Sequence, residues 1–300
     1  MVKIRKYAKT FKIKKSISYK NRLIHNVNNF LCTSVLTFCY LSGCIYQHQR
    51  FLFFYFLFSD MAKVQLFIPC FVDQLYPETG MNMVKVLEKL GCDVTYNTKQ
   101  TCCGQPAFNA GYRDEAKSVA TKFLHDFKEN TYIVSPSGSC TGYVRNCYND
   151  LFDNSSDHNL CSQVQENMYE FTEFLTKVLK VDNVGAMLNG KATYHDACGA
   201  LRECGIKNGP RKLLANVSGL EMVEMKECET CCGFGGTFAI KFEPISIGMA
   251  QTKVKSALDT GAKYMITTDV SCMMHIQGYI NENRLPIQTM HIADVLASGW

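Results

Sequence analysis

From Met61 onward, short apolar segments alternate with segments whose apolar residues recur at helical spacing. The run Val64–Ile68 predicts a strand, and the apolar positions from Met83 to Leu90 predict a helix after it. The pattern continues with a strand at 94–96, a helix at about 114–128, a strand at 132–134 and a helix that begins near 138. Such alternation is typical of a mostly parallel sheet covered by helices.

A polar stretch at 154–159 leads to an apolar stripe from Val164 to Val178, which predicts an amphipathic helix. The earlier order of elements then returns as a strand at 192–194, a helix opening at Pro210, a strand at 222–225, a helix with apolar residues from Ile247 to Leu258 and a strand at 264–267. We therefore expect an α/β fold of two duplicated, pseudo-twofold related domains, each a small, mostly parallel sheet flanked by helices. The expected domains are residues 61–153 and 191–300, with a helical linker at 154–190.

The first sixty residues do not share this pattern. They contain ten Lys or Arg against one acidic residue, and two apolar runs, Phe30–Tyr46 and Phe51–Phe58. A basic segment before an apolar run resembles a membrane anchor, but the longer run is short for a span and contains Thr, Ser and Cys. We expect a mis-assigned start, with translation beginning at Met61, or a disordered extension, and a membrane anchor is the alternative.

The distribution of charge excludes one class of function. The net charge of +5 comes from the first sixty residues, because residues 61–300 hold 22 basic and 26 acidic side chains. A mildly acidic body lacks the basic surface that nucleic-acid binding requires.

Cysteine is the unusual component, with sixteen in the chain. Eight of them form a repeated pattern of a single cysteine, a vicinal pair followed by glycine, and another single cysteine. The members are Cys70, Cys102, Cys103 and Cys140 in the first half and Cys198, Cys231, Cys232 and Cys272 in the second. The gaps are 31 and 36 residues in the first half and 32 and 39 in the second. The duplication therefore extends to the candidate chemistry.

Each of these cysteines follows a predicted strand or lies in the loop before the next helix. Such loops gather at the carboxyl edge of a parallel sheet, so each half is predicted to bring four thiolates together. The backbone amides near Gly104, Gly138, Gly233 and Gly235 are candidate hydrogen-bond donors to a negatively charged cluster. The other cysteines at 92, 147, 161, 204 and 228 are interpreted as small buried residues, with Cys147 and Cys228 as candidate auxiliary ligands.

Three alternatives compete for the thiols. Disulfides fit badly, because they are rare in a reducing cytosol and vicinal Cα atoms are only about 3.8 Å apart. Structural zinc usually takes short CxxC knuckles, which this pattern lacks, although four thiolates would suit it. Thiol redox chemistry is the third alternative. Adjacent cysteines at long spacing favour iron–sulfur clusters over these, and we expect two clusters of the [4Fe–4S] type.

The segments IPCFVDQLYP, TCCGQPAFNAG, SPSGSC, YHDACGALRE, ETCCGFGGTFAIK and TTDVSCMMHI resemble the cysteine-rich CCG-domain proteins, in particular the lactate utilisation protein A family. The resemblance covers about Ala62 to Trp300. It implies an iron–sulfur electron-transfer subunit that acts with partner proteins B and C in oxidising L-lactate to pyruvate in the cytoplasm. Relatives include the iron–sulfur subunit of glycolate oxidase and the cysteine-rich subunit of heterodisulfide reductase. The latter's fifth thiolate, in a terminal CxxC, is absent here after Cys140 and Cys272.

His195 and Asp196, just before Cys198, are the candidate catalytic residues, as proton carriers in lactate oxidation. The simpler interpretation is that both brace the Cys198 loop by hydrogen bonding. Whether this chain is itself catalytic stays open at this point. The alternatives to electron transfer are a thiol/disulfide oxidoreductase like heterodisulfide reductase and a zinc-stabilised scaffold.

Overall fold

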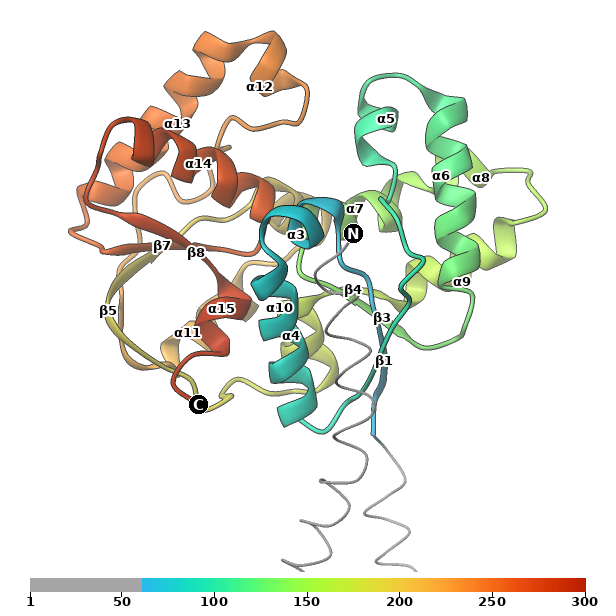
Figure 1. Cartoon of the computed structure of the whole chain (residues 1–300), viewed down its shortest axis with the longest axis horizontal. Coiled ribbons are helices and arrows are strands. Elements are labelled where there is room, and N and C mark those ends of the chain that lie inside the picture. The colour runs from blue at the N-terminus through green and yellow to red at the C-terminus, as the bar shows by residue number, and fades with distance from the viewer. Residues whose placement is uncertain (1–60) are drawn as a thin grey trace, which may run out of the picture. The chain divides into compact units, whose positions relative to one another are not determined.

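The computed structural model describes residues 61–300, and Figure 1 shows their helices and strands in colour. The predictions for residues 1–60, including the anchor and the cysteines at 32, 39 and 44, lie outside the described residues. Within residues 61–300, no helix combines the length and the apolar character needed to cross a membrane.

The first half is built on a four-stranded parallel sheet in the order β2-β1-β3-β4. Its strands are β1 (Lys63–Leu66), β2 (Asp93–Tyr96), β3 (Tyr132–Ser135) and β4 (Met168–Glu170). Its helices are α3 (Cys70–Leu75), α4 (Pro77–Lys89), α5 (Gln105–Asn109), α6 (Arg113–Asp126), α7 (Gly138–Cys147), α8 (Asn149–Phe152) and α9 (His158–Asn167).

The second half repeats this sheet, with four parallel strands in the equivalent order β6-β5-β7-β8. Its strands are β5 (Met187–Tyr194), β6 (Ser218–Met222), β7 (Tyr264–Thr267) and β8 (Gln288–His291). The π-helix η2 (Gly199–Glu203) and the helices α11 (Asn208–Ala215), α12 (Phe238–Lys241), α13 (Glu243–Leu258), α14 (Val270–Glu282) and α15 (Ile292–Leu296) accompany them. The predicted α/β class and its duplication are confirmed.

The amphipathic helix predicted between Val164 and Val178 is wrong as one continuous helix. Helix α9 ends at Asn167, and β4 then pairs with β3, before α10 (Phe171–Glu173) and the π-helix η1 (Phe174–Val178). The apolar stripe is nevertheless buried at Met168 and Leu175. Its spacing suits a helix, but pairing with β3 holds the middle of the segment extended and completes the sheet. The stretch expected as a helical linker thus contributes a strand.

The two halves have cores of different character. In the first, Phe67 lies edge-on to Phe123, with ring centroids 4.8 Å apart, and the rings of Phe127 and Tyr148 extend this aromatic cluster. The second core is mainly aliphatic and sulfur-containing, with Met225, Val254, Met265 and Ile276 among its members. Edge-to-face rings add to the stabilisation that burial provides.

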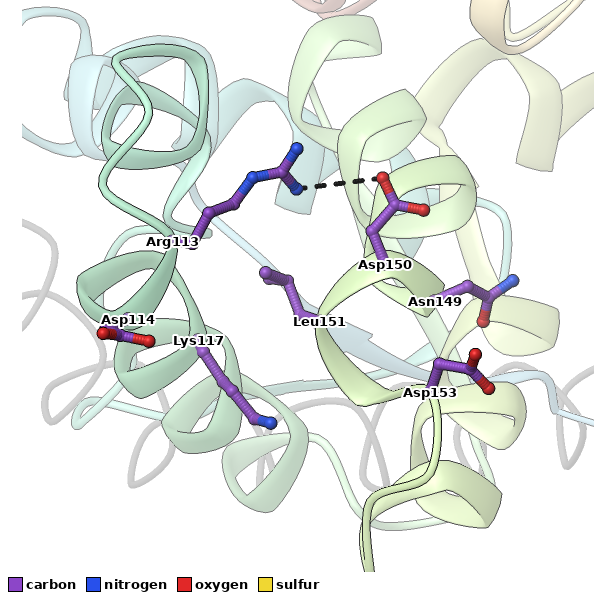
Figure 2. Close-up of a pocket in the computed structure, with 7 residues that line it drawn as sticks. All are labelled: Arg113, Asp114, Lys117, Asn149, Asp150, Leu151 and Asp153. Atoms are coloured by element: carbon purple, nitrogen blue, oxygen red, sulfur yellow. Dashed lines mark ion pairs between the residues drawn. The ribbon is translucent and has the colours of Figure 1, made fainter.

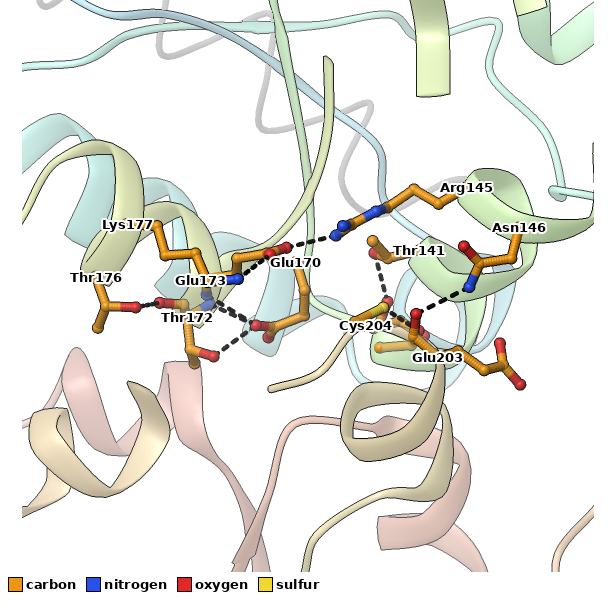
Figure 3. Close-up of polar contacts among 12 residues, drawn as sticks. Thr141, Arg145, Asn146, Glu170, Thr172, Glu173, Thr176, Lys177, Glu203 and Cys204 are labelled. Carbon is orange, nitrogen blue, oxygen red and sulfur yellow. Dashed lines mark hydrogen bonds and ion pairs between the residues drawn. The ribbon is translucent and has the colours of Figure 1, made fainter. Parts of the chain in front are cut away.

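The halves pack closely through α7 and η2 within one compact unit. A Cβ on Gly138 would lie 2.5 Å from the Cβ of Ala200, so this contact requires glycine. The Sγ of Cys204 lies 3.6 Å from the carbonyl oxygen of Gly138, and the Asn146 amide donates to the carbonyl of Glu203 at 2.9 Å. Figure 3 shows Cys204 and the Asn146–Glu203 contact, together with Glu173, whose carboxylate pairs with Arg145 and Lys177.

Candidate metal centre

The eight predicted cysteines lie at the carboxyl edges of the two sheets. Each set occupies the loops or first helical turns that follow three strands, which are β1, β2 and β3 in the first half and β5, β6 and β7 in the second. Loops at this edge converge because the strands are parallel, which brings together residues that are far apart in sequence. The sequence pattern predicted this placement.

In the first half the four thiols form a continuous chain of contacts. Cys102 shares hydrogen bonds with Cys70 and Cys103, and Cys103 shares one with Cys140. Hydrogen bonds from the Cys103 and Cys70 thiols lower the pKa of Cys102 to about 3, and the amide of Gly104 assists. The same contacts and burial raise the pKa values of Cys70 and Cys103. The site therefore favours a thiolate, the form that binds metals, at Cys102.

The second half repeats this arrangement. Cys231 shares hydrogen bonds with Cys198 and Cys232, and Cys232 shares one with Cys272. Hydrogen bonds from the thiols of Cys198 and Cys232 lower the pKa of Cys231 to about 2. In both halves the first cysteine of the vicinal pair is thus the favoured thiolate. The structure brings together all four members of each predicted set, and their role as metal ligands stays a prediction.

The glycine after each vicinal pair has a conformation that other residues rarely adopt. Gly104 has φ +95° and Gly233 has φ +96°, so each turns the chain sharply. Each amide then lies 3.4 Å from the sulfur two residues earlier, that of Cys102 or Cys231. These amides supply the predicted hydrogen bonds to sulfur. Gly138 instead permits the close contact between the halves.

The loops that carry the two cysteine sets touch each other. The ring of Phe71, next to Cys70, lies edge-on to the ring of Phe234, with centroids 5.8 Å apart. The backbone amide of Ser139, next to Cys140, donates a hydrogen bond to the carboxylate of Asp269. The two candidate centres therefore lie on loops that touch across the junction between the halves.

Asp196 has the contacts of a positioning residue. Its buried carboxylate pairs with the Arg211 guanidinium through two hydrogen bonds of 2.8 and 2.7 Å. Its backbone amide donates to the carbonyl of Cys228 at 3.0 Å, which ties the Cys198 loop to the chain before Cys231. Nothing in the sequence pattern indicated Arg211, because its partner is fixed by packing.

His195 is completely buried, and neither ring nitrogen has a partner with good hydrogen-bond geometry among the described residues, although the backbone of Cys228 lies close enough to raise its pKa. Burial lowers the pKa of His195 to about 3, with the nearby Lys253 ammonium acting in the same direction. Its ring nitrogen and the sulfurs of Cys232 and Cys272 lie within 4.8 Å of one another. Lys253, buried beside this group, was missed in the sequence because a lysine in a helix is normally expected at the surface.

The comparison with protein families agrees with this repeated geometry. The cysteine-rich domain family CCG matches the chain twice, over residues 64–145 and 192–277. The chain belongs to the CCG cysteine-rich domain family. Each match includes all four predicted cysteines of one half, the second and third strands of its sheet in chain order, and part of the first strand.

Two relatives are similar to this chain over nearly their whole length. Lactate utilization protein A 1 of Bacillus mycoides is 44% identical over 236 residues, which are 78% of this chain and 96% of that protein. Lactate utilization protein A of an Exiguobacterium species is 43% identical, over 80% of this chain and 98% of that protein. A hypothetical protein from Helicobacter pylori has a similar fold, with a TM-score of 0.53 at 11% identity over 79% of this chain and 49% of that chain.

The donor chemistry of this CCG chain fits a metal. Each half offers four sulfurs linked by successive contacts, one of them favoured as a thiolate, and none of the thirteen cysteines within residues 61–300 is in a disulfide. The cysteine-rich family and these clusters together indicate metal binding. Of the remaining cysteines, those at 92, 161 and 204 are buried, and Cys228 lies near Asp196 and Glu229 in a second possible ligand group.

A separate pocket of about 630 Å³ lies between α6 and α8, lined by Arg113, Lys117, Asp150 and neighbouring residues (Figure 2). Arg113 and Asp150 face each other there at 3.8 Å. None of the predicted ligand cysteines lines this pocket, so it is distinct from the candidate metal centre.

Proposed function

We propose that this chain is an iron–sulfur electron-transfer subunit of a system that oxidises L-lactate to pyruvate. The observation that carries the proposal is the pair of four-cysteine sets whose loops touch through Phe71 and Phe234. Two redox centres in neighbouring loops suit the passage of electrons through a protein. The names of the relatives, lactate utilization protein A, supply the metabolic context.

In this proposal the ligands are Cys70, Cys102, Cys103 and Cys140 in one half and Cys198, Cys231, Cys232 and Cys272 in the other. A bound iron–sulfur cluster supplies one-electron redox chemistry. The chain's residues hold and tune each centre, because the amides of Gly104 and Gly233 donate to sulfur. Asp196 and Arg211 keep the Cys198 loop in place.

The partners that we propose are the B and C proteins of the lactate utilisation system. Oxidation of lactate to pyruvate releases two electrons and two protons, and a redox centre in a partner takes the electrons before this chain accepts them singly. Ile240 in α12, Phe242 between the helices and Ile245 in α13 are exposed, shortly after the Cys231–Cys232 loop. Such an exposed apolar group suits contact with another protein.

Reconstitution of the three proteins tests this function. With both partners present, L-lactate is expected to bleach the visible absorbance of this chain, whereas D-lactate or the chain alone with L-lactate leaves it unchanged. Ile240→Asp should slow the bleaching while the absorbance of the isolated chain is retained. Turnover of lactate by the chain without partners would favour an enzyme instead, and a colourless zinc protein would favour a scaffold.

A further inference from the structure

The two halves differ at one buried position next to the cysteines. His195 and Phe67 are equivalent, since each lies three residues before the first cysteine of its set. Phe67 is packed against the rings of Phe123 and Phe127. His195 is equally buried, yet neither of its ring nitrogens has a partner with good hydrogen-bond geometry among residues 61–300, although the backbone of Cys228 lies close enough to raise its pKa. A buried polar group without a partner is costly, so its presence calls for a physical reason.

The position of the ring supplies that reason. A ring nitrogen of His195 and the sulfurs of Cys232 and Cys272 lie within 4.8 Å of one another, and all three residues are buried. The backbone holds the histidine in place, because its amide donates to the carbonyl of Ile266 in β7 at 2.8 Å. An imidazole that converges with two thiols on one point is a metal-ligand arrangement.

We propose that His195 is a nitrogen ligand of the metal centre in the second half, so that this centre has four thiolates and one imidazole whereas the first has thiolates only. The inference rests on the proposed metal-binding function and deepens it. Histidine ligates iron in some iron–sulfur centres, where it changes the reduction potential. The two halves would then hold centres of different potential.

A second difference between the halves supports this asymmetry. Lys253 in α13 corresponds to Phe123 in α6. Each lies three residues after a buried alanine, which is Ala250 in α13 and Ala120 in α6. Lys253 is 1% exposed and donates to the carbonyl of Glu227. The aromatic pair Phe67–Phe123 of the first half is thus replaced by the polar pair His195 and Lys253. A buried ammonium beside thiolates offsets negative charge at the second centre alone.

Pulsed electron paramagnetic resonance on the anaerobically purified, chemically reduced full chain tests the proposal. The wild-type protein should show a hyperfine coupling from a coordinated nitrogen, and labelling of histidine with ¹⁵N should shift that coupling. His195→Phe, which copies the first half, and His195→Cys, which supplies a thiolate instead, should both lose it. Phe67→Leu, the matched control in the first half, should retain it.

The outcomes separate the two proposals. Iron in both halves without any coupling that responds to histidine labelling would overturn the assignment of His195 and leave the proposed function standing. A coupling that persists in His195→Phe would overturn it as well. A chain without iron would overturn the proposed function. Because the isotope test needs no substitution, failure of a variant to fold does not affect it, and retention of the first centre's signal reports folding of the variants.

Discussion

The carboxylate of Asp269 accepts a hydrogen bond of 2.8 Å from the backbone amide of Ser139, which lies in the other half of the molecule. Asp269 also accepts from the amide of Ser271 at the start of α14, as Ser137 accepts from the amide of Cys140 at the start of α7. Ser137 and Asp269 are equivalent helix caps and pair with each other through an isolated bridge. The two helices that begin beside Cys140 and Cys272 are therefore fixed relative to each other.

Substitution of Asp269 should destabilise the structure that holds both candidate metal centres. Asp269→Ala removes the cap of α14 and leaves the Ser139 amide without its partner, so the free energy of unfolding should fall by roughly 2 kcal/mol. Denaturant titration followed by circular dichroism measures the change. Glu282→Ala, at an exposed position in the same helix, should change the stability little. Equal effects of the two substitutions would contradict the role given to Asp269.

Because α7 and η2 pack closely, replacing Gly138 by alanine should affect stability differently from replacing Gly278 by alanine. Gly138→Ala would place a methyl group against the backbone of Ala200 and should lower the free energy of unfolding by about 2 kcal/mol. Gly278→Ala lies in the interior of α14 with open space around it and should raise the stability by up to about 1 kcal/mol. Thermal unfolding of both variants tests whether the first substitution lowers the stability and the second raises it. Stabilisation by Gly138→Ala would contradict the close packing of α7 against η2.

The ion pair of Arg211 and Asp196, beside the second centre, should show a large coupling energy in protein stability. Arg211→Met leaves the buried Asp196 carboxylate without its counter-charge and should cost roughly 3 kcal/mol of stability. The double variant Arg211→Met with Asp196→Asn should recover part of this loss, because the remaining buried group is neutral. A double-mutant cycle on unfolding free energies measures the coupling, and strictly additive effects would argue against a direct pair.

Glu170 makes stability depend on pH. Burial raises the pKa of Glu170 from 4.5 to about 8, although hydrogen bonds from Thr172 and the Glu173 amide oppose the shift. Between these values the folded protein holds a proton that the unfolded chain releases, so stability falls as pH rises, by up to about 1.4 kcal/mol per pH unit. The decline should level off above pH 8, where folded Glu170 ionises.

Glu170→Gln removes this titration and keeps an acceptor for the Thr172 hydroxyl. Relative to the variant, the wild-type protein should therefore lose stability from pH 5 to pH 8. Unfolding measured for both proteins at several pH values gives the difference directly. Parallel pH profiles would show that Glu170 does not stay protonated in the folded state.

The sequence predicted most of what repeats between the halves. The apolar runs of β1, β3 and β7 were enough to predict these strands. The spacing of the eight cysteines was enough to predict that each set clusters, because a parallel sheet brings the ends of its strands together. Strand β8, with the polar sequence QTMH, has no apolar signal and was not predicted. Strand β4 was missed because the apolar residues around it also fit the spacing of a helix.

Contacts between distant residues could not be predicted in this way. The pairs Ser139–Asp269 and Arg211–Asp196 depend on how surfaces meet after folding, and no spacing encodes them. The asymmetry between His195 and Phe67 was visible in principle, since alignment of the two halves on their first cysteines places them together. The structure adds that the buried ring lies beside the sulfurs of Cys232 and Cys272, which is the basis of the proposal for His195.

Metal analysis of the anaerobically purified chain tests the central claim most directly. Iron and acid-labile sulfide should be present and zinc absent in the wild-type protein, and Cys103→Ser and Cys232→Ser should each lose about half of the iron because each removes a ligand from one centre. Cys92→Ala, outside both sets, should retain all of it. Full iron in both serine variants, or zinc in place of iron, would contradict the claim.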